Sequence, residues 1–204
     1  MTLQNRVLPT GDIVAVPSYG DLMGNRGILH DEVRQLGTAR WTHPNWVTCL
    51  LEYKGRKREL MAPGRYTELF FLDEATALAA GHRPCGECRK TAFAKFRAAW
   101  NAAHGDTDLR SLDKRLHRDR VSRTRQQIRY DAYPADLPDG TFILHNDTPH
   151  VVHGNIILRY EPSGYTASAT LPQSLVQVLT PACTVATLAQ GYRPELHRTA
   201  AISR

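Results

Sequence analysis

The stretch FFLDEATALAAGHRPCGECR, residues 70–89, decides how the first half of the chain folds. The apolar run at 68–72 is typical of a short strand, and Asp73 follows it in the position of a helix N-cap. Residues 74–80 are good helix formers, and Gly81 fits the position just after a helix end. Pro84 comes soon afterwards, as is common beyond a helix stop. The stretch therefore predicts a strand, a short helix and a sharp stop in direct succession.

A C-x-x-C pair, Cys85 and Cys88, follows this stop. Two thiolates at this spacing can bind one Zn²⁺, because Gly86 lets the backbone fold tightly around the metal. A redox pair of the thioredoxin type is the competing interpretation, but no leading βαβ pattern precedes these cysteines. A structural zinc site needs four ligands, so two more must come from elsewhere in the chain.

Upstream residues supply the candidates for the two remaining ligands. The predicted zinc site consists of His30, Cys49, Cys85 and Cys88. His43 is the alternative to one of the first two. Cys49 has a second interpretation, because it lies within an expected strand where a Cys is often a core residue. Cys183 is expected to be a buried thiol in the second sheet.

Residues 70–75 and 80–89 resemble the second half of the Ada-type metal-binding domain. That module typically reads as a strand ending in Phe, a short helix with Glu-Ala, and then Ala-Gly-aromatic-Arg-Pro-Cys-x-x-Cys-Arg. Upstream, Gly24, Asn25 and Arg26 with His30 resemble the Gly-Asn-Lys…His opening of Ada-like zinc modules. As a whole, the chain resembles a bacterial protein family rather than a named enzyme.

The resemblance implies a zinc held by four side chains, mostly Cys, in a small α/β unit that binds DNA. Cys85 and Cys88 carry over as ligands. In the parent repair regulator, a zinc-bound Cys of an upstream C-x-x-x-C pair accepts a methyl group from DNA phosphotriesters. This chain has only Cys49 upstream, so the methyl-acceptor role is not carried over. The resemblance does not reach residues 105–204.

The charge of the chain favours an anionic partner. It has 26 Lys+Arg against 20 Asp+Glu, a net charge of +6, and its densest basic segment is 110–129, which overlaps a helical pattern that runs from 109 to 128. Nucleic acid, with DNA favoured, is the partner that such a surface predicts. The residues expected to contact phosphates are Arg83, Arg89, Lys90, Arg115, Arg118 and Arg123. Asp113, His117 and Arg120 share one face of that helix, either as a general-base cluster or as an ion-pair ladder.

The expected fold class is α+β in three parts. Residues 1–105 form a small Ada-like zinc-binding α/β module, with strands at 13–18 and 46–53 and a return strand at 58–61 pairing with the latter. Residues 106–130 form a basic helix or linker. Residues 131–204 form a small antiparallel β-rich domain, because short apolar runs alternate there with turns.

These features predict a zinc-dependent nucleic-acid-binding protein that recognises DNA, including modified or damaged DNA. One alternative is a nuclease or nucleic-acid-modifying enzyme built on the zinc scaffold, with Asp113 and His117, or Glu68, as its catalytic groups. The other is a module that binds a protein or a small ligand. No run approaches 18 apolar residues, and the first twenty residues lack the pattern of a signal peptide. We therefore expect a cytoplasmic protein with no membrane partner.

Overall fold

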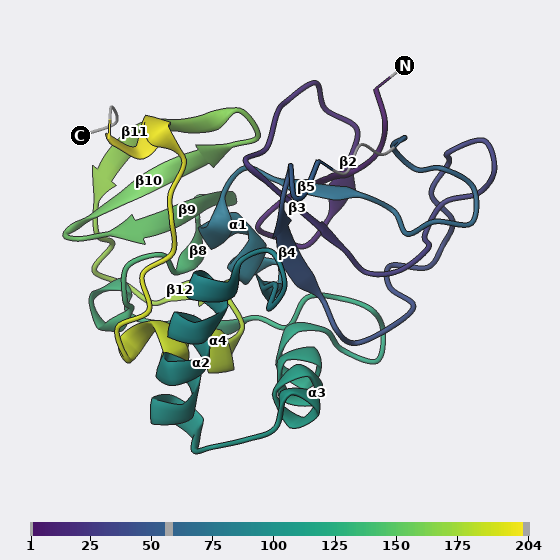
Figure 1. Ribbon diagram of the computed structural model, residues 1–204. Helices are drawn as coiled ribbons and strands as arrows, with labels where there is room; N and C mark the ends of the chain where they lie inside the picture. Colours follow the sequence, from purple (N-terminus) through teal and green to yellow (C-terminus); the bar gives the residue numbers. More distant parts are fainter. Residues whose placement is uncertain (1, 56–58, 202–204) are drawn as a thin grey trace.

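The chain folds into two sheets with helices packed against them, in a computed structural model that describes residues 2–55 and 59–201 (Figure 1). Each sheet has six strands, and most neighbouring strands run antiparallel. The two sheets and four α-helices confirm the predicted α+β class. The predicted return strand at 58–61 begins at a residue outside the described part of the chain, because residues 56–58 are not described.

The first sheet has the strand order β2-β1-β5-β3-β4-β6. Its strands are β1 (Arg6–Val7), β2 (Ile13–Val14), β3 (Leu22–Asn25), β4 (Val47–Leu50), β5 (Leu69–Phe71) and β6 (Arg83–Pro84). β4 pairs antiparallel with β3 and parallel with β6. The prediction that residues 59–61 return beside β4 is wrong, because both edges of β4 are already taken and these residues form a turn.

The segment that decides the fold behaves as its sequence predicts. β5 is followed by Asp73, whose carboxylate accepts a hydrogen bond from the backbone N–H of Thr76 and caps α1 (Glu74–Ala79). Gly81 then takes a φ of 83°, a left-handed conformation that residues with a side chain rarely adopt. β6 begins two residues later. All six residues of α1 are buried, so this short helix lies inside the molecule rather than on its surface.

Three further helices are α2 (Lys90–His104), α3 (Leu109–Arg120) and α4 (Ala182–Ala189). α2, α3 and α4 share an apolar core with Leu78 of α1, centred on Trp100 and Leu116. The prediction of a helix to residue 128 is wrong, because the chain leaves α3 at Val121 and forms a tight turn closed by a bridge between Val121 and Gln127. Within the described residues, no helix has the length and apolarity needed to cross a membrane.

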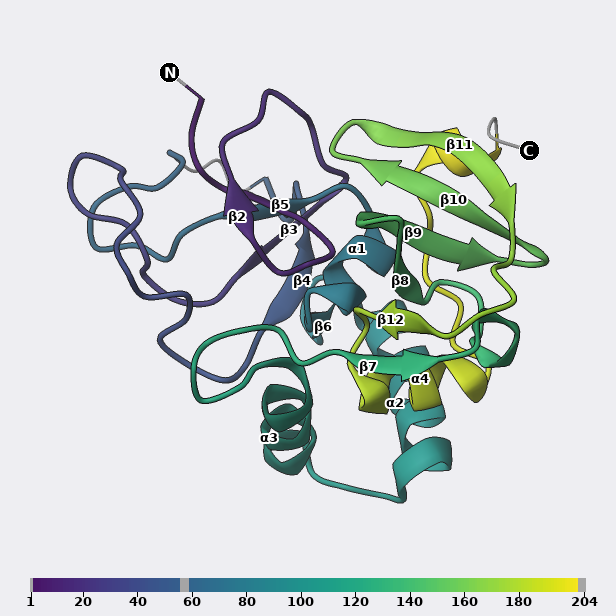
Figure 2. The ribbon, with the colours of Figure 1, turned by 180° about the vertical axis from the view of Figure 1, so that it is seen from behind.

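The second half forms the expected antiparallel sheet, seen from behind in Figure 2. Its order is β11-β10-β9-β8-β12-β7. The strands are β7 (Tyr130–Ala132), β8 (Phe142–His145), β9 (Thr148–His153), β10 (Ile156–Glu161), β11 (Gly164–Thr170) and β12 (Val176–Val178). Single turns of 3₁₀ helix lie at Pro134–Asp136 and Arg198–Ala201.

The helix α1 joins the two halves, as Figure 1 shows near the centre of the molecule. Leu72, Ala75 and Ala79 pack in one core with Phe142 and other residues of the second sheet. The Asp73 carboxylate also accepts hydrogen bonds from the Tyr165 hydroxyl at 2.6 Å and from the backbone N–H of His197 at 3.0 Å. The division at 105 and 130 stays a prediction, and the hydrophobic core crosses both of those positions.

Replacing Asp73 with Ala is expected to destabilise the protein by about 3–5 kcal/mol, since it leaves several buried donors without an acceptor. Asp108→Ala is the matched control, because Asp108 caps α3 in the same way, by accepting from the backbone N–H of Ser111, but is exposed. Urea denaturation of the two variants measures the difference. Equal losses in the two variants would contradict a central role for Asp73.

Candidate metal centre

The three upstream cysteines converge where β4 meets β6. Val47 and Thr48 pair with Arg83 and Pro84, and the backbone N–H of Cys85 continues the ladder by donating to the Thr48 carbonyl at 2.9 Å. This register brings Cys49, near the end of β4, beside the C-x-x-C loop. The sulfur atoms of Cys49, Cys85 and Cys88 all lie within 4.8 Å of one another. The predicted grouping of these three residues therefore forms from two segments that are far apart in the sequence.

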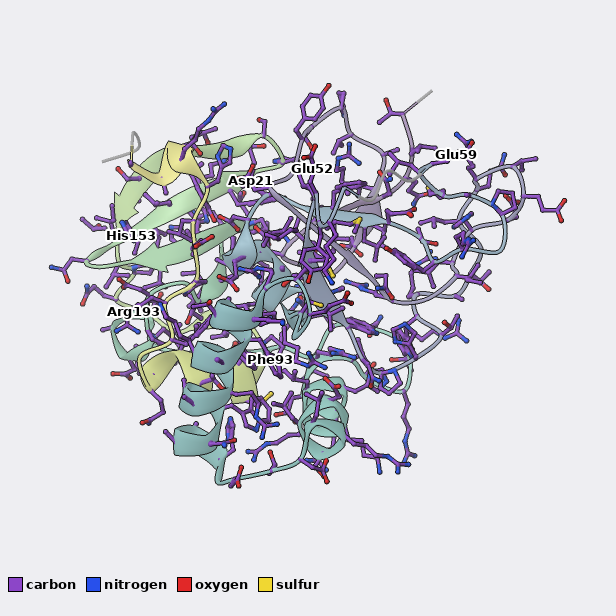
Figure 3. All side chains as sticks on the ribbon, viewed as in Figure 1. Asp21, Glu52, Glu59, Phe93, His153 and Arg193 are labelled. Carbon is purple, nitrogen blue, oxygen red and sulfur yellow. The ribbon has the colours of Figure 1, made fainter. Side chains whose placement is uncertain are left out.

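The loop from Cys85 to Cys88 has the local structure that a metal site requires. The N–H of Glu87 donates to the Cys85 sulfur at 3.4 Å, and the N–H of Arg89 donates to the Cys85 carbonyl at 3.1 Å. Gly86 allows close packing, because a Cβ there would lie 3.3 Å from the ring of Phe93 on α2 (Figure 3). In this loop the sulfur atoms of Cys85 and Cys88 both lie near the sulfur atom of Cys49.

Zinc fits this donor set. A tetrahedral site with Zn–S bonds of about 2.3 Å separates its sulfur atoms by about 3.8 Å, so small side-chain movements would bring three thiolates to a common ion. Thiolates also select soft or borderline metals over magnesium and calcium. Among the described residues, no His, Asp or Glu joins the three sulfurs as a fourth ligand. All three cysteines are half-buried, so the centre lies within reach of the surface.

The three thiols have different proton affinities. Hydrogen bonds from Cys49 and from backbone N–H groups lower the pKa of Cys85 to about 5. The pKa of Cys49 is raised, first by the hydrogen bond that it donates to Cys85 and then by burial. Burial also raises the pKa of Cys88. At neutral pH the cluster therefore carries one thiolate, centred on Cys85, and two thiols.

His30, the fourth predicted ligand, lies elsewhere. It is buried, its Nδ1 is 2.7 Å from the Thr67 hydroxyl, and its Nε2 is 3.3 Å from the Ala62 carbonyl. The alternative, His43, has its Nε2 3.1 Å from the Asn25 side-chain oxygen. The structure does not bring either imidazole into the group of three sulfurs. Cys183 is a buried thiol as predicted, but it lies on α4 in the core shared by the helices rather than in the second sheet.

Two of the predicted phosphate contacts are occupied inside the protein. Arg83 forms a bidentate pair with Asp113 at 2.7 and 2.8 Å, and Arg89 pairs with Glu74 at 2.9 Å. Both guanidinium groups are buried. By contrast, Lys90, Arg118 and Arg123 are exposed, and Arg115 is half-buried. The sequence shows where the positive charges are, but no sequence pattern indicates that buried carboxylates lie against Arg83 and Arg89.

The helical face of Asp113, His117 and Arg120 serves as a set of internal contacts. Asp113 is held by Arg83, and the Nη2 of Arg120 donates to the Nδ1 of His117 at 2.9 Å. Burial, together with the charge of Arg120, lowers the pKa of His117. Arg120 itself is almost fully buried against Trp46, which no sequence pattern indicated.

Comparison with known proteins adds no relative. No model of a protein family, no curated protein and no solved structure matches this chain.

Purified without a chelating tag, the protein is expected to contain one zinc per chain by elemental analysis. Cys49→Ser, Cys85→Ser and Cys88→Ser should each lose it, because each removes one of three converging thiolates. Cys183→Ala should retain it, since that thiol is in a separate core. Wild-type protein free of metal would exclude the site.

Zinc affinity is expected to rise with pH. Two thiols must lose protons on binding at pH 7, because Cys85 is already ionised while Cys49 and Cys88 have raised pKa values. The apparent affinity should therefore increase about a hundredfold per pH unit between pH 6 and 8, which competition with a chromophoric chelator measures. A pH-independent affinity would refute this assignment of protons.

Proposed function

We propose that this chain is a zinc-dependent nucleic-acid-binding protein, with DNA, including modified or damaged DNA, as the favoured partner. Zinc would bind Cys49, Cys85 and Cys88 and fix the edge of the first sheet. The resemblance of residues 70–89 to the Ada-type domain belongs to this proposal and supports the choice of zinc. The observation that carries the nucleic-acid part is an arginine-rich hollow beside the end of α3.

This hollow lies between residues 39–41 and the turn that follows α3, and has a volume of about 620 Å³. Its lining residues are Ala39, Arg40, Trp41, His117, Arg118, Val121, Ser122, Arg123, Arg125 and Ile128. Four of them are arginines, and none is acidic. Cations interspersed with an aromatic ring are the usual composition of a surface that binds phosphates and bases.

Further exposed basic residues lie on α3 and beyond the turn. Arg110 and Lys114 lie on the outer face of α3, and Arg129 follows the turn. Because α3 ends at Arg120, the arginines beyond it lie on a tight turn rather than around the sides of one long helix. The turn brings Arg123 and Arg125 into the same hollow as Arg118. A continuous helix would distribute these arginines around its circumference, so they could not all contact one groove.

The groups named for an enzymatic alternative are engaged within the fold. His117 lines the hollow, but its Nδ1 accepts a hydrogen bond from the Nη2 of Arg120 at 2.9 Å. Glu68 is buried and accepts the backbone N–H of Met61 at 2.7 Å, and Asp113 is buried against Arg83. A general base must reach the proton that it abstracts, so these contacts do not favour catalysis by either carboxylate. Binding is accordingly the function that the geometry supports best.

Arg118→Ala and Arg123→Ala are each expected to weaken binding to a labelled DNA duplex and to reduce the slope of log affinity against log salt by about one unit. Fluorescence anisotropy at several salt concentrations measures both quantities. The matched control is Arg159→Ala, which removes an exposed arginine from β10 in the second sheet.

The result that would contradict the proposal is specific. If wild-type protein loaded with zinc does not bind duplex or single-stranded DNA at low salt, the nucleic-acid function fails. If Arg159→Ala weakens binding as much as Arg118→Ala, the attraction is diffuse and the hollow is not the interface.

A further inference from the structure

A second cavity, of about 490 Å³, adjoins the hollow and reaches into the interior. It lies between the turn at 10–12, the segment around Trp41 and Trp46, the end of α1 and the turn after α3. Its lining contains five arginines, Arg26, Arg40, Arg120, Arg125 and Arg129, and three glutamines, Gln126, Gln127 and Gln177. Asp12 is its one acidic lining residue. The cavity therefore carries a large excess of positive charge.

Two of these arginines are buried against one aromatic ring. The guanidinium carbon of Arg26 lies 4.1 Å from the centre of the Trp46 ring, and that of Arg120 lies 3.7 Å from it. Only 3% of Arg26, 1% of Arg120 and 1% of Trp46 is exposed. The ring supplies cation–π attraction to both, but it does not neutralise their charge.

The hydrogen bonds of the buried arginines go to neutral acceptors. Arg26 donates from Nε to the Nε2 of His82 at 3.0 Å and from Nη1 to the Gly11 carbonyl at 3.2 Å. Arg120 donates to the carbonyls of Gly81 and Pro44 and to the imidazole of His117. Two buried donors, the Nη2 of Arg26 and the Nε of Arg120, have no hydrogen-bond partner among the residues that the structure describes.

The arginines at the rim of the cavity also donate their hydrogen bonds to neutral acceptors. Arg40 donates to the carbonyls of Gly37 and Ala39, and Arg125 donates to the carbonyl of Thr38. Arg129 donates to the side-chain oxygens of Gln127 and Gln177. Carbonyls and amides orient these guanidinium groups without compensating their charge.

Within the described part of the chain, none of the five arginines forms an ion pair. The charge of Asp12 acts on Arg26 and that of Asp113 acts on Arg120. Asp12 is exposed and accepts the hydroxyl of Thr10 at 2.7 Å, and Asp113 is already paired with Arg83. Burial lowers the pKa of Arg26 to about 9, although the charge of Asp12 opposes the shift. A buried cation without a counter-charge is costly, so a fold that retains two of them side by side needs an external anion to account for them.

We propose that this cavity binds the phosphate group of a nucleotide-sized ligand, with the free Nη2 of Arg26 as the innermost donor. Planar guanidinium forks match the oxygens of phosphate, and several can share one dianion. The volume exceeds that of phosphate alone, and Trp41 with the exposed amides of Gln126 and Gln177 offers stacking and hydrogen bonds to a base. The site requires neither zinc nor a DNA duplex, so it goes beyond the function proposed above.

The phosphate could belong to a free nucleotide or to the end of a nucleic-acid strand, and calorimetric titrations distinguish these sources. The probes are inorganic phosphate, a nucleoside 5′-monophosphate, the same nucleoside without phosphate, and one short oligonucleotide with and without a 5′-phosphate. The monophosphate is expected to bind more tightly than inorganic phosphate, and the nucleoside is expected not to bind. Preference for the phosphorylated oligonucleotide over the free nucleotide would assign the strand end as the source.

Variants then locate the site. Arg26→Lys keeps the charge but loses the second Nη donor, and should weaken binding of the monophosphate about tenfold or more. Because Arg26 is buried and its variant could fail to fold, Arg129→Ala at the exposed rim provides an independent test with the same direction of effect. The control is Arg159→Ala, which removes an exposed arginine from β10 in the second sheet and should leave monophosphate binding unchanged.

A ligand that binds the folded state also raises the melting temperature, so millimolar monophosphate should stabilise wild type more than Arg129→Ala. Absence of binding to folded wild type at millimolar concentration would overturn the proposal, as would equal binding of the nucleoside or unchanged binding by Arg129→Ala. Failure of duplex binding with intact monophosphate binding would affect only the function proposed above.

Discussion

Two adjacent buried carboxylates at the start of α1 hold the two halves of this protein together. Asp73 accepts hydrogen bonds from Thr76, Tyr165 and the backbone of His197. Glu74 accepts from Arg89, from the Tyr192 hydroxyl at 2.6 Å and from the backbone of Glu195 at 3.1 Å. A buried carboxylate is stable only when its oxygen atoms accept hydrogen bonds. The segment 192–197 and β11 supply these donors and therefore pack over the helix.

The same helix connects these carboxylates to both candidate sites. At its start, Glu74 pairs with Arg89, which also donates to the hydroxyl of Thr48, the neighbour of Cys49. At its end, the carbonyl of Gly81 accepts from Arg120, and the carbonyl of Ala79 accepts from Gln127. The three-cysteine cluster and the arginine-lined cavity are thus fixed relative to one short element, with the cysteines beyond one end and the cavity at the other.

Much of the local structure could be predicted because it depends on neighbours in sequence. The cap at Asp73, the left-handed Gly81 and the turn between Cys85 and Cys88 are set by residues within a few positions of each other. The antiparallel second half followed from alternating strands and turns in the same way. The strand partner of β4 was mispredicted, since pairing depends on which distant strand covers its edge.

By itself, the sequence determined the α+β class, the short helix after β5 and the C-x-x-C loop, all of which depend on local conformational preference. The tertiary fold, in contrast, controls which charged side chains are available to bind a partner. It buried Arg83 and Arg89 against carboxylates, and it brought Arg26 and Arg120 to the ring of Trp46 without one. The physical reason is that the free energy of a charge depends on burial and on its nearest counter-charge, and both are set by residues remote in sequence.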